Sequence, residues 1–306
     1  MKNPTVLGSV LMIILSATTT SGLADTLTAD WDVEALRAEI AADHLTFDVA
    51  ENWVTRFLAA GGNIKDITGL ERPANWEELG RFTSLAEEEL ILPKSFSWPR
   101  LVGRGLQPIR NQGSCGSCWA FSITAVIESL HMIAQGHSDL DLAEQTLVSS
   151  CEEGGTCSGG YFDAFDYVAR SGLPSERDDP YVARNTSCRQ NLAPKGRIRN
   201  WGYIGAAGRE PTTEEIKQAI FKYGPVSVDV NGSFGAYAGG IYNRCNTGGT
   251  NHMVTLEGWD DVDQVWIMRN SWGAEWGENG YMRIKFTDAQ GRKCNGIGRV
   301  AAFAEI

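Results

Sequence analysis

The sequence of 306 residues predicts an α+β protein with two lobes. Up to about residue 170, apolar residues recur at the three- and four-residue spacing of amphipathic helices. From Pro225 onward they form short or alternating runs bounded by Gly, Asp and Asn, as strands do. A hydrophobic content of 42% with only 21% charged residues excludes a largely disordered chain. We find no internal repeat and no low-complexity tract.

The chain begins with the layout of a secretory signal peptide, because Lys2 precedes an apolar run at 6–15 and small residues follow up to Ala24. No later stretch is apolar over enough residues to span a bilayer. We therefore expect residues 1–24 to be removed, and the mature protein to be secreted, periplasmic or in a lysosome-like compartment, without a membrane anchor. Disulfides form in such compartments.

Residues 25–90 contain 15 acidic and 5 basic residues and so carry almost all of the net charge of −11. Apolar residues predict helices over 31–40 and 49–58, with Asp30 as N-cap of the first and Gly61-Gly62 at the end of the second. The acidic segment, residues 25–91, is either a solvated helical subdomain or a detachable prosegment. The charge argues against nucleic acid as a partner, since phosphate binding needs clustered Lys and Arg.

The rest of the chain predicts three helices, at 120–132, 142–148 and 161–169, and four strands, at 226–230, 253–256, 265–268 and 281–284. In the first of these strands, Val226, Val228 and Val230 alternate with Ser227 and Asp229. This alternation predicts a strand that is buried on one face only.

Two cysteines, Cys115 and Cys118, lie where a glycine-rich loop gives way to an apolar helical run. Seven cysteines in an oxidising compartment suggest three disulfides and one free thiol. A thiol attacks as the thiolate, and its usual pKa of about 8.5 is lowered at a helix N-terminus and beside an imidazolium. Because Cys118 is expected at the start of the helix that buries Phe121, we interpret it as the nucleophile and Cys115 as a structural half-cystine.

The histidine that pairs with Cys118 must come from elsewhere in the chain, and there are four. His44 lies in the acidic segment, and His131 and His137 lie at or beyond the end of the same helix, on the order of 20 Å from its start. This leaves His252, which follows Gly248-Gly249 at the head of a predicted strand.

A catalytic imidazole needs its second nitrogen held, and Asn270 at the end of the neighbouring predicted strand can supply an amide oxygen. Trp272 would shield that hydrogen bond from water. Gln112 and the backbone N–H of Cys118 are suitably placed in sequence to stabilise an oxyanion.

The Cys-Gly-Ser-Cys pair also permits a thiol–disulfide redox interpretation. Against it, Trp119 follows the pair, no βαβ pattern surrounds it, and other cysteines compete for Cys115. A protein that binds peptides without cleaving them is a third interpretation, which the complete set of Cys, His, Asn and Gln makes less favourable.

Together these residues resemble a known family. Residues 112–121, Gln-Gly-Ser-Cys-Gly-Ser-Cys-Trp-Ala-Phe, are similar to the active-site signature of papain-like cysteine proteases, in which His and Asn follow about 130–150 residues later. Further similar runs lie at 157–161, 224–228 and 270–281. The resemblance covers the chain from about residue 92 to 303.

The resemblance implies a papain-like fold, with a helical left lobe, a β-barrel-type right lobe, and Cys118 and His252 facing each other across the cleft. It implies a peptidase domain at 92–306 and peptide or protein substrates. From its position before that domain, we expect the segment 25–91 to be a prosegment that acts as an intramolecular inhibitor, and we expect a monomer with no cofactor or metal. The resemblance also implies three disulfides: Cys115–Cys157, Cys151–Cys188 and Cys245–Cys294.

By the same resemblance, Gly159 and Gly160 bind the substrate backbone in a strand-like manner. The substrate side chain two residues before the cut would enter a pocket lined by Tyr161, Phe162, Asp229, Met253 and Val300, with Trp272 at the site as well. Val300 suggests an apolar preference. Asp229 either points away from the pocket as a solvated strand residue, which we expect, or lines it and admits Arg or Lys.

Three departures from the family pattern bear on activity. No histidine-bearing, cysteine-closed insertion like that of cathepsin B lies between Tyr161 and Cys188, so we expect an endopeptidase. Asn251 stands where many relatives have Asp. The N-terminal segment is shorter than in many papain-like precursors, and we expect it to loosen as its carboxylates protonate below about pH 5.

Overall fold

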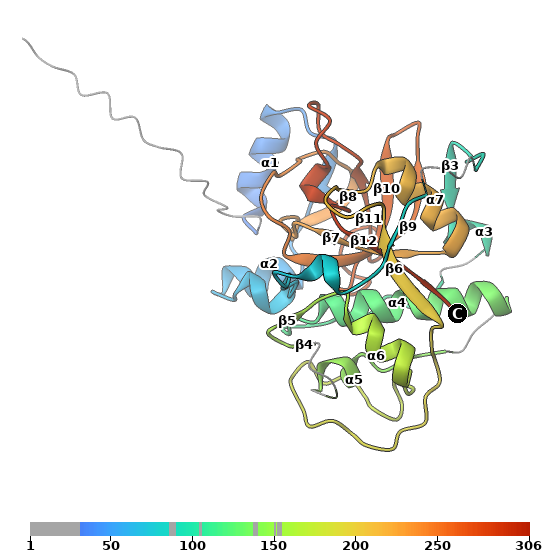
Figure 1. The fold of residues 1–306 in the computed structure, drawn as a ribbon. Coiled ribbons are helices and arrows are strands. Elements are labelled where there is room, and N and C mark those ends of the chain that lie inside the picture. The colour runs from blue at the N-terminus through green and yellow to red at the C-terminus, as the bar shows by residue number, and fades with distance from the viewer. Residues whose placement is uncertain (1–30, 86–89, 104–105, 137–139, 150, 152–154) are drawn as a thin grey trace, which may run out of the picture.

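The computed structural model describes residues 31–85, 90–103, 106–136, 140–149, 151 and 155–306. Three helices lie apart from most of the strands, as Figure 1 shows. The helices α4 (Cys118–Gln135), α5 (Glu144–Val148) and α6 (Ala164–Ser171) lie together in the lower part of the view, and most strands lie above them. The α+β fold with two lobes that the sequence predicts is confirmed.

In the described part of the chain, ten strands form one mixed sheet in the order β1-β8-β11-β10-β9-β7-β12-β6-β2, with β3 paired to β9. Only the pairs β8–β11 and β2–β6 are parallel. The bounds are β1 Phe47–Val49, β2 Phe82–Thr83, β3 Ser95–Ser97, β6 Asn200–Ile204, β7 Val226–Val230, β8 Tyr237–Tyr242, β9 His252–Asp260, β10 Val265–Arg269, β11 Tyr281–Lys285 and β12 Ala301–Glu305. Both end strands, β1 and β2, belong to the acidic segment, which is therefore bonded to both edges of the sheet.

Two hydrophobic clusters correspond to the two lobes. One joins most of the sheet to α1 (Val33–Ala42), α2 (Trp53–Ala59) and α7 (Thr213–Tyr223). The other surrounds α4, α5 and α6. Of the 18 residues of α4, 14 are buried, so this helix is covered on nearly all sides and forms the centre of the helical lobe.

Smaller elements complete the described chain. These are the short helix α3 (Trp98–Leu101), the hairpin of β4 (Gly155–Thr156) and β5 (Gly159–Gly160), and three 3₁₀ turns, η1 (Ile64–Ile67), η2 (Trp76–Glu78) and η3 (Cys294–Gly296).

The predicted helices and strands of the peptidase part are all present; the strand at 226–230 has the predicted bounds, and the ends of the others are shifted. Six strands and two α-helices of this part were not predicted: β3, β4, β5, β6, β8 and β12, and α3 and α7. The start of α7 carries a sequence signal that we did not use, because Thr212 and Glu215 form a reciprocal capping box.

Two expectations about the acidic segment were wrong. Val49 lies in strand β1, and α2 begins only at Trp53, where Asn52 caps it through hydrogen bonds to the next turn. The N-cap of α1 is Asp32, whose side chain accepts from Ala35 N, whereas the predicted cap Asp30 lies outside the described residues.

The prediction that β7 is buried on one face only is also wrong, because all five of its residues are buried. This strand lies between β9 and β12, and Ser227 bonds Ser122 of α4 through their hydroxyls at 2.6 Å. The polar members of the alternating pattern thus face the helical lobe instead of water.

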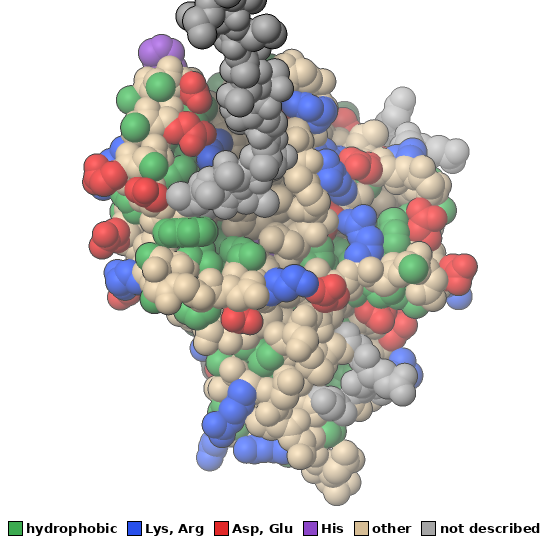
Figure 2. All heavy atoms as spheres, turned by 90° about the vertical axis from the view of Figure 1, so that its left-hand side faces the viewer, with side chains coloured by type: hydrophobic (Ala, Val, Ile, Leu, Met, Phe, Trp, Pro, Cys, Tyr) green, Lys and Arg blue, Asp and Glu red, His purple; other side chains and the backbone are tan. Residues whose placement is uncertain are grey.

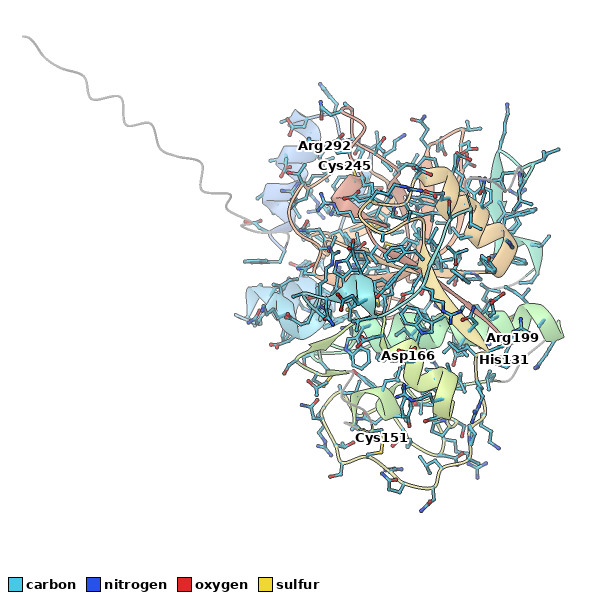
Figure 3. All side chains as sticks on the ribbon, viewed as in Figure 1. His131, Cys151, Asp166, Arg199, Cys245 and Arg292 are labelled. Carbon is cyan, nitrogen blue, oxygen red and sulfur yellow. A yellow bond between two sulfur atoms is a disulfide. The ribbon has the colours of Figure 1, made fainter. Side chains whose placement is uncertain are left out.

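Three disulfides join Cys115 to Cys157, Cys151 to Cys188 and Cys245 to Cys294, which are the pairs that the resemblance implies. Figure 3 places Cys151 in the lower, helical lobe and Cys245 in the upper part, so covalent links stabilise both. None of the described helices combines the length and apolar character needed to cross a membrane. On the face shown in Figure 2, acidic and basic side chains are interspersed without one dominant patch.

Candidate active site

Cys118 is the first residue of α4, as predicted, and its side chain is fully buried. It is the free cysteine of the described chain. The backbone N–H of Met253 donates to its sulfur at 3.3 Å, so the start of β9 lies against the start of the helix. Because Cys115 is bonded to Cys157, the redox interpretation of the Cys-Gly-Ser-Cys pair has no support.

His252 opens strand β9 and is brought to the same place. Its Nε2 lies 2.8 Å from Oδ1 of Asn270, which directly follows the neighbouring strand β10. That oxygen also accepts from Ser271 N, so the imidazole Nε2 is the donor of the pair. The Trp272 ring stacks on the imidazole at 4.8 Å between centroids, which shields this hydrogen bond from water.

The remaining nitrogen of the ring, Nδ1, is buried and has no hydrogen-bond partner among the described residues. In the neutral ring it is therefore the basic nitrogen. The other histidines lie elsewhere: His44 is exposed, His131 lies at the far end of α4 in Figure 3, and His137 is outside the described residues.

Gln112 and the backbone of Cys118 donate to the same oxygen. Gln112 Nε2 lies 3.2 Å, and Cys118 N 3.3 Å, from the carbonyl oxygen of Thr68. Gln112 is fixed in turn because its Oε1 accepts from the Ser271 hydroxyl at 2.6 Å and its Nε2 also donates to Cys115 O at 2.9 Å. The two donors thus converge on a single carbonyl group, which comes from the acidic segment.

Residues 67–71 of the acidic segment pass directly over these groups. Trp272 Nε1 donates to Ile67 O at 2.7 Å. Gly160 N donates to Gly69 O at 3.0 Å, and Gly160 O accepts from Glu71 N at 3.1 Å, in a short parallel pairing. The segment covers the thiol, the imidazole and the glycine backbone together.

The protein-family model described as "Papain family cysteine protease" matches residues 92–303 of this chain. The chain belongs to this family. The chain is 37% identical over 220 residues to the cathepsin L-like proteinase of Phaedon cochleariae, covering 69% of this chain and 65% of that protein. It is 37% identical over 228 residues to cysteine protease 1 of Oryza sativa, covering 69% of this chain and 44% of that protein. The chain thus spans less than two thirds of the length of these relatives.

Among solved structures, digestive procathepsin L2 from the larval midgut of Tenebrio molitor matches with a TM-score of 0.77 and 31% identity. The match covers 90% of this chain and 89% of that chain. Because this span is longer than residues 92–303, the likeness to a papain-family precursor extends into the acidic segment. This favours a prosegment over an independent subdomain.

The papain-family pair is neutral in this covered state. Burial raises the pKa of the Cys118 thiol to about 12, although backbone N–H groups of Met253, Trp119 and Cys118 itself oppose the shift. Burial lowers the pKa of His252 to about 4 against the hydrogen bond to Asn270. We expected the helix start to lower the thiol pKa; its N–H groups do act in that direction, but the loss of water is the larger effect.

The residues predicted to line a pocket for the substrate side chain are mainly apolar. Tyr161, Phe162, Met253 and Val300 are buried in the cluster of the helical lobe, together with Leu70 of the acidic segment.

Asp229 is not solvated, so our expectation for it was wrong. The residue is fully buried, and its carboxylate accepts from Val300 N at 2.7 Å and from the Thr250 hydroxyl at 2.9 Å. It also forms an ion pair with Arg72 of the acidic segment at 2.5 Å.

Sequence reasoning missed two contributors to the site, Ser271 and Arg72, and named a third, Asn251, without predicting its contacts. Ser271 holds Gln112, and its place inside the Asn-Ser-Trp run was the available signal. Asn251 accepts from Gly232 N through Oδ1, and its carbonyl oxygen accepts from Gly69 N and Leu70 N. Arg72 carries no local sequence signal for its pairing, because its partner is 157 residues away.

Proposed function

We propose that this chain is the precursor of a secreted cysteine endopeptidase, with a signal peptide at 1–24, an inhibitory prosegment at 25–91 and a catalytic domain at 92–306. The observation that carries this proposal is the donation of Gln112 Nε2 and Cys118 N to one peptide carbonyl, at 3.2 and 3.3 Å, next to the hydrogen-bonded His252 and Asn270. A carbonyl held by two donors beside a thiol is arranged for acyl transfer.

In the mature enzyme, the Cys118 thiolate attacks the scissile carbonyl carbon and a C–S bond forms. The two donors stabilise the oxyanion. As the C–N bond breaks, His252 gives its proton to the leaving amine, and a thioester remains. Water then attacks the thioester while His252 takes its proton, which releases the acid and restores the thiolate. Asn270 orients the imidazole throughout.

The prosegment blocks this chemistry in two ways. It removes water from the pair, so that thiol and imidazole stay neutral. It also fills the oxyanion position with the Thr68 carbonyl. The residues that follow Thr68 pair with Gly160, whereas a substrate would present the residues that precede its scissile carbonyl. The prosegment therefore runs opposite to a substrate and resists cleavage.

The substrates are peptides or proteins, which bind along Gly159 and Gly160 with their side chains toward Tyr161, Met253 and Val300. We propose endopeptidase activity because the stretch from Tyr161 to Cys188 has no occluding insertion. The enzyme acts as a monomer, without cofactor, metal or nucleic acid, in an oxidising secretory or lysosome-like compartment, which three disulfides favour.

Release of the prosegment is triggered by acid. Two of its carboxylates contact the catalytic domain: Glu39 pairs with Arg244 at 2.5 Å, and Glu77 accepts from Gly208 N at 3.1 Å. Protonation of the acidic segment's carboxylates below about pH 5 weakens its attachment to the catalytic domain. A precursor that matures equally fast at pH 4 and pH 7 would contradict this trigger.

The proposed function is tested by incubating the precursor at pH 4, sequencing the new N-terminus, and measuring peptide hydrolysis and labelling by an epoxide thiol probe. Wild-type protein should mature, hydrolyse and be labelled, and Cys118→Ala should do none of these. To separate maturation from catalysis, Cys118→Ala is also matured with added wild-type enzyme. Hydrolysis by that product, once the wild-type enzyme is removed, would refute the role of Cys118, and insulin reduction by the wild type would revive the redox interpretation.

A further inference from the structure

Asp229 is a buried carboxylate. Its one ion-pair partner among the described residues is Arg72, which lies in the prosegment that maturation removes. Burying a carboxylate is costly unless it is paired and hydrogen-bonded. Two partners, Val300 N and Thr250 Oγ1, belong to the catalytic domain and remain after maturation. The cation that pairs with it, Arg72, belongs to the prosegment and leaves. Burial raises the pKa of Asp229, and the Val300 N–H, the Arg72 guanidinium, the Thr250 hydroxyl and, more weakly, Lys293 of the catalytic domain oppose that shift.

Arg72 reaches Asp229 from the line along which a substrate would lie. It directly follows Glu71, whose N–H donates to Gly160 O, and a Cβ on Gly159 would meet the Glu71 side chain. Its guanidinium lies 5.4 Å from the ring centroid of Trp76, another prosegment residue, and its second contact is Thr250 Oγ1 at 3.3 Å. A side chain from beside the substrate-binding glycines thus enters the pocket and ends on the carboxylate.

Removal of the prosegment takes away Arg72 and Trp76 together. Among the described contacts, the carboxylate oxygen that held Arg72 then keeps the Thr250 hydroxyl. Met253, which pairs with Asp229 across the sheet, and Val300 and Tyr161 supply the apolar walls of the proposed pocket. Such a pocket holds the aliphatic part of a long basic side chain, and the acid at its end pairs with the charged head.

We propose that the mature enzyme selects Arg or Lys two residues before the scissile bond, with Asp229 as the specificity residue and Arg72 as the prosegment's stand-in for that side chain. This rests on the proposed peptidase function. A pocket built around a charged partner discriminates strongly against a substrate that lacks the partner, because the buried group is then left unpaired.

The test compares kcat/KM for two fluorogenic reporters, Arg-Arg and Phe-Arg, that differ only two residues before the cut. Asp229→Asn keeps the acceptor for Val300 N and removes the charge, so the fold is expected to persist. The ratio of Arg-Arg to Phe-Arg should fall by at least about tenfold. The control, Asp263→Asn, removes an exposed carboxylate and should leave the ratio unchanged.

If Asp229→Asn leaves the ratio unchanged, the inference is wrong while the proposed function stands. If matured wild type hydrolyses neither reporter, the proposed function itself fails.

A second measurement covers the case in which Asp229→Asn does not mature to active enzyme. In the full-length precursor with Cys118→Ala, cleavage of the prosegment by added wild-type enzyme is timed for Arg72→Leu, Asp229→Asn and the double variant. In the Cys118→Ala precursor, Arg72→Leu should raise the rate of prosegment cleavage. In the precursor that also carries Asp229→Asn, Arg72→Leu should change that rate little, because the two groups act as a pair. Arg56→Leu, an exposed arginine on α2, is the control. Additive effects of the two substitutions would overturn the pairing.

Discussion

At the scale of single residues, the site depends on His252 having one nitrogen held and the other free. Asn270 accepts from Nε2 at 2.8 Å, Trp272 covers the bond, and Nδ1 is left without a partner in the described structure. The neutral tautomer is thereby fixed, with its basic nitrogen available to the thiol. Asn270 does not touch the substrate in this scheme, so it is a positioning residue.

We expect Asn270→Ala to lower kcat by up to about 100-fold with a much smaller change in KM, because the imidazole loses its orientation but the binding cleft remains. Steady-state kinetics of the matured enzyme measures this. Asn200→Ala, which removes an exposed amide on β6, is the control. If kcat/KM falls because KM rises while kcat stays unchanged, Asn270 acts in substrate binding instead.

Gln112→Ala removes one of the two donors to the oxyanion position, and kcat should fall by about 10²- to 10³-fold. Ser271→Ala is the matched comparison, because it removes the hydroxyl that fixes Gln112 Oε1 but keeps the Nε2 donor. Its effect should be clearly smaller. Equal losses in the two variants would mean that Gln112 acts through packing and not as a donor.

At the scale of elements, residues 67–71 work as a covering strand because the chain can approach the catalytic loop closely. Gly69 has a φ of +116°, and a Cβ there would lie 2.0 Å from the carbonyl oxygen of Gly116. No side chain fits this position without moving the strand away from Cys118.

Gly69→Ala should therefore yield a leaky precursor, in which an epoxide thiol probe labels Cys118 at pH 7 at least about tenfold faster than in wild type, before any cleavage. Gly61→Ala is a close control: its φ is also positive, at +89°, but no atom lies within 4 Å of the added Cβ. The rate of Cys118 labelling is measured by gel and mass spectrometry. If Gly69→Ala labels no faster than wild type, the prediction is wrong, and if both alanine variants label equally faster than wild type, backbone strain and not the clash is responsible.

At the scale of the whole molecule, buried carboxylates make stability depend on pH. Glu128 on α4 is buried, its Oε1 accepts from Leu142 N at 2.7 Å, and burial raises its pKa to about 7. Glu144 and Glu257 are shifted in the same direction by burial. Through these carboxylates the folded state binds more protons than the unfolded chain between about pH 4.5 and 7, so their contribution to stability falls as the pH rises. His252, whose pKa burial lowers to about 4, opposes this trend, but the raised carboxylates outnumber it.

The free energy of unfolding of the Cys118→Ala precursor should thus be higher at pH 5 than at pH 7, and Glu128→Gln should reduce that difference by on the order of 2 kcal/mol. Urea unfolding at the two pH values measures it. Glu51→Gln, at an exposed site, should leave the difference unchanged. A larger stability at pH 7 than at pH 5 would show that other groups outweigh the buried carboxylates.

Much of the chemistry could be read from the sequence because its signals are local. The position of Cys118 at a helix start follows from a glycine-rich loop before an apolar run, and the choice of His252 follows from excluding three others. The strands β7, β9, β10 and β11 follow from short apolar runs between turn residues. By contrast, β6, β8 and β12 have no comparable pattern that we could use, and they become strands through pairing with neighbours distant in sequence.

The sequence by itself selected the residues proposed to carry the reaction, because residue type and local spacing limit the choice of nucleophile, base and donors. Only the tertiary structure decided their state. The prosegment buries Cys118 and His252, which holds the pair neutral, and it brings Arg72 to Asp229 across 157 residues. Burial and long-range pairing arise from the packing of distant segments, and neither a helical nor a strand periodicity contains that information.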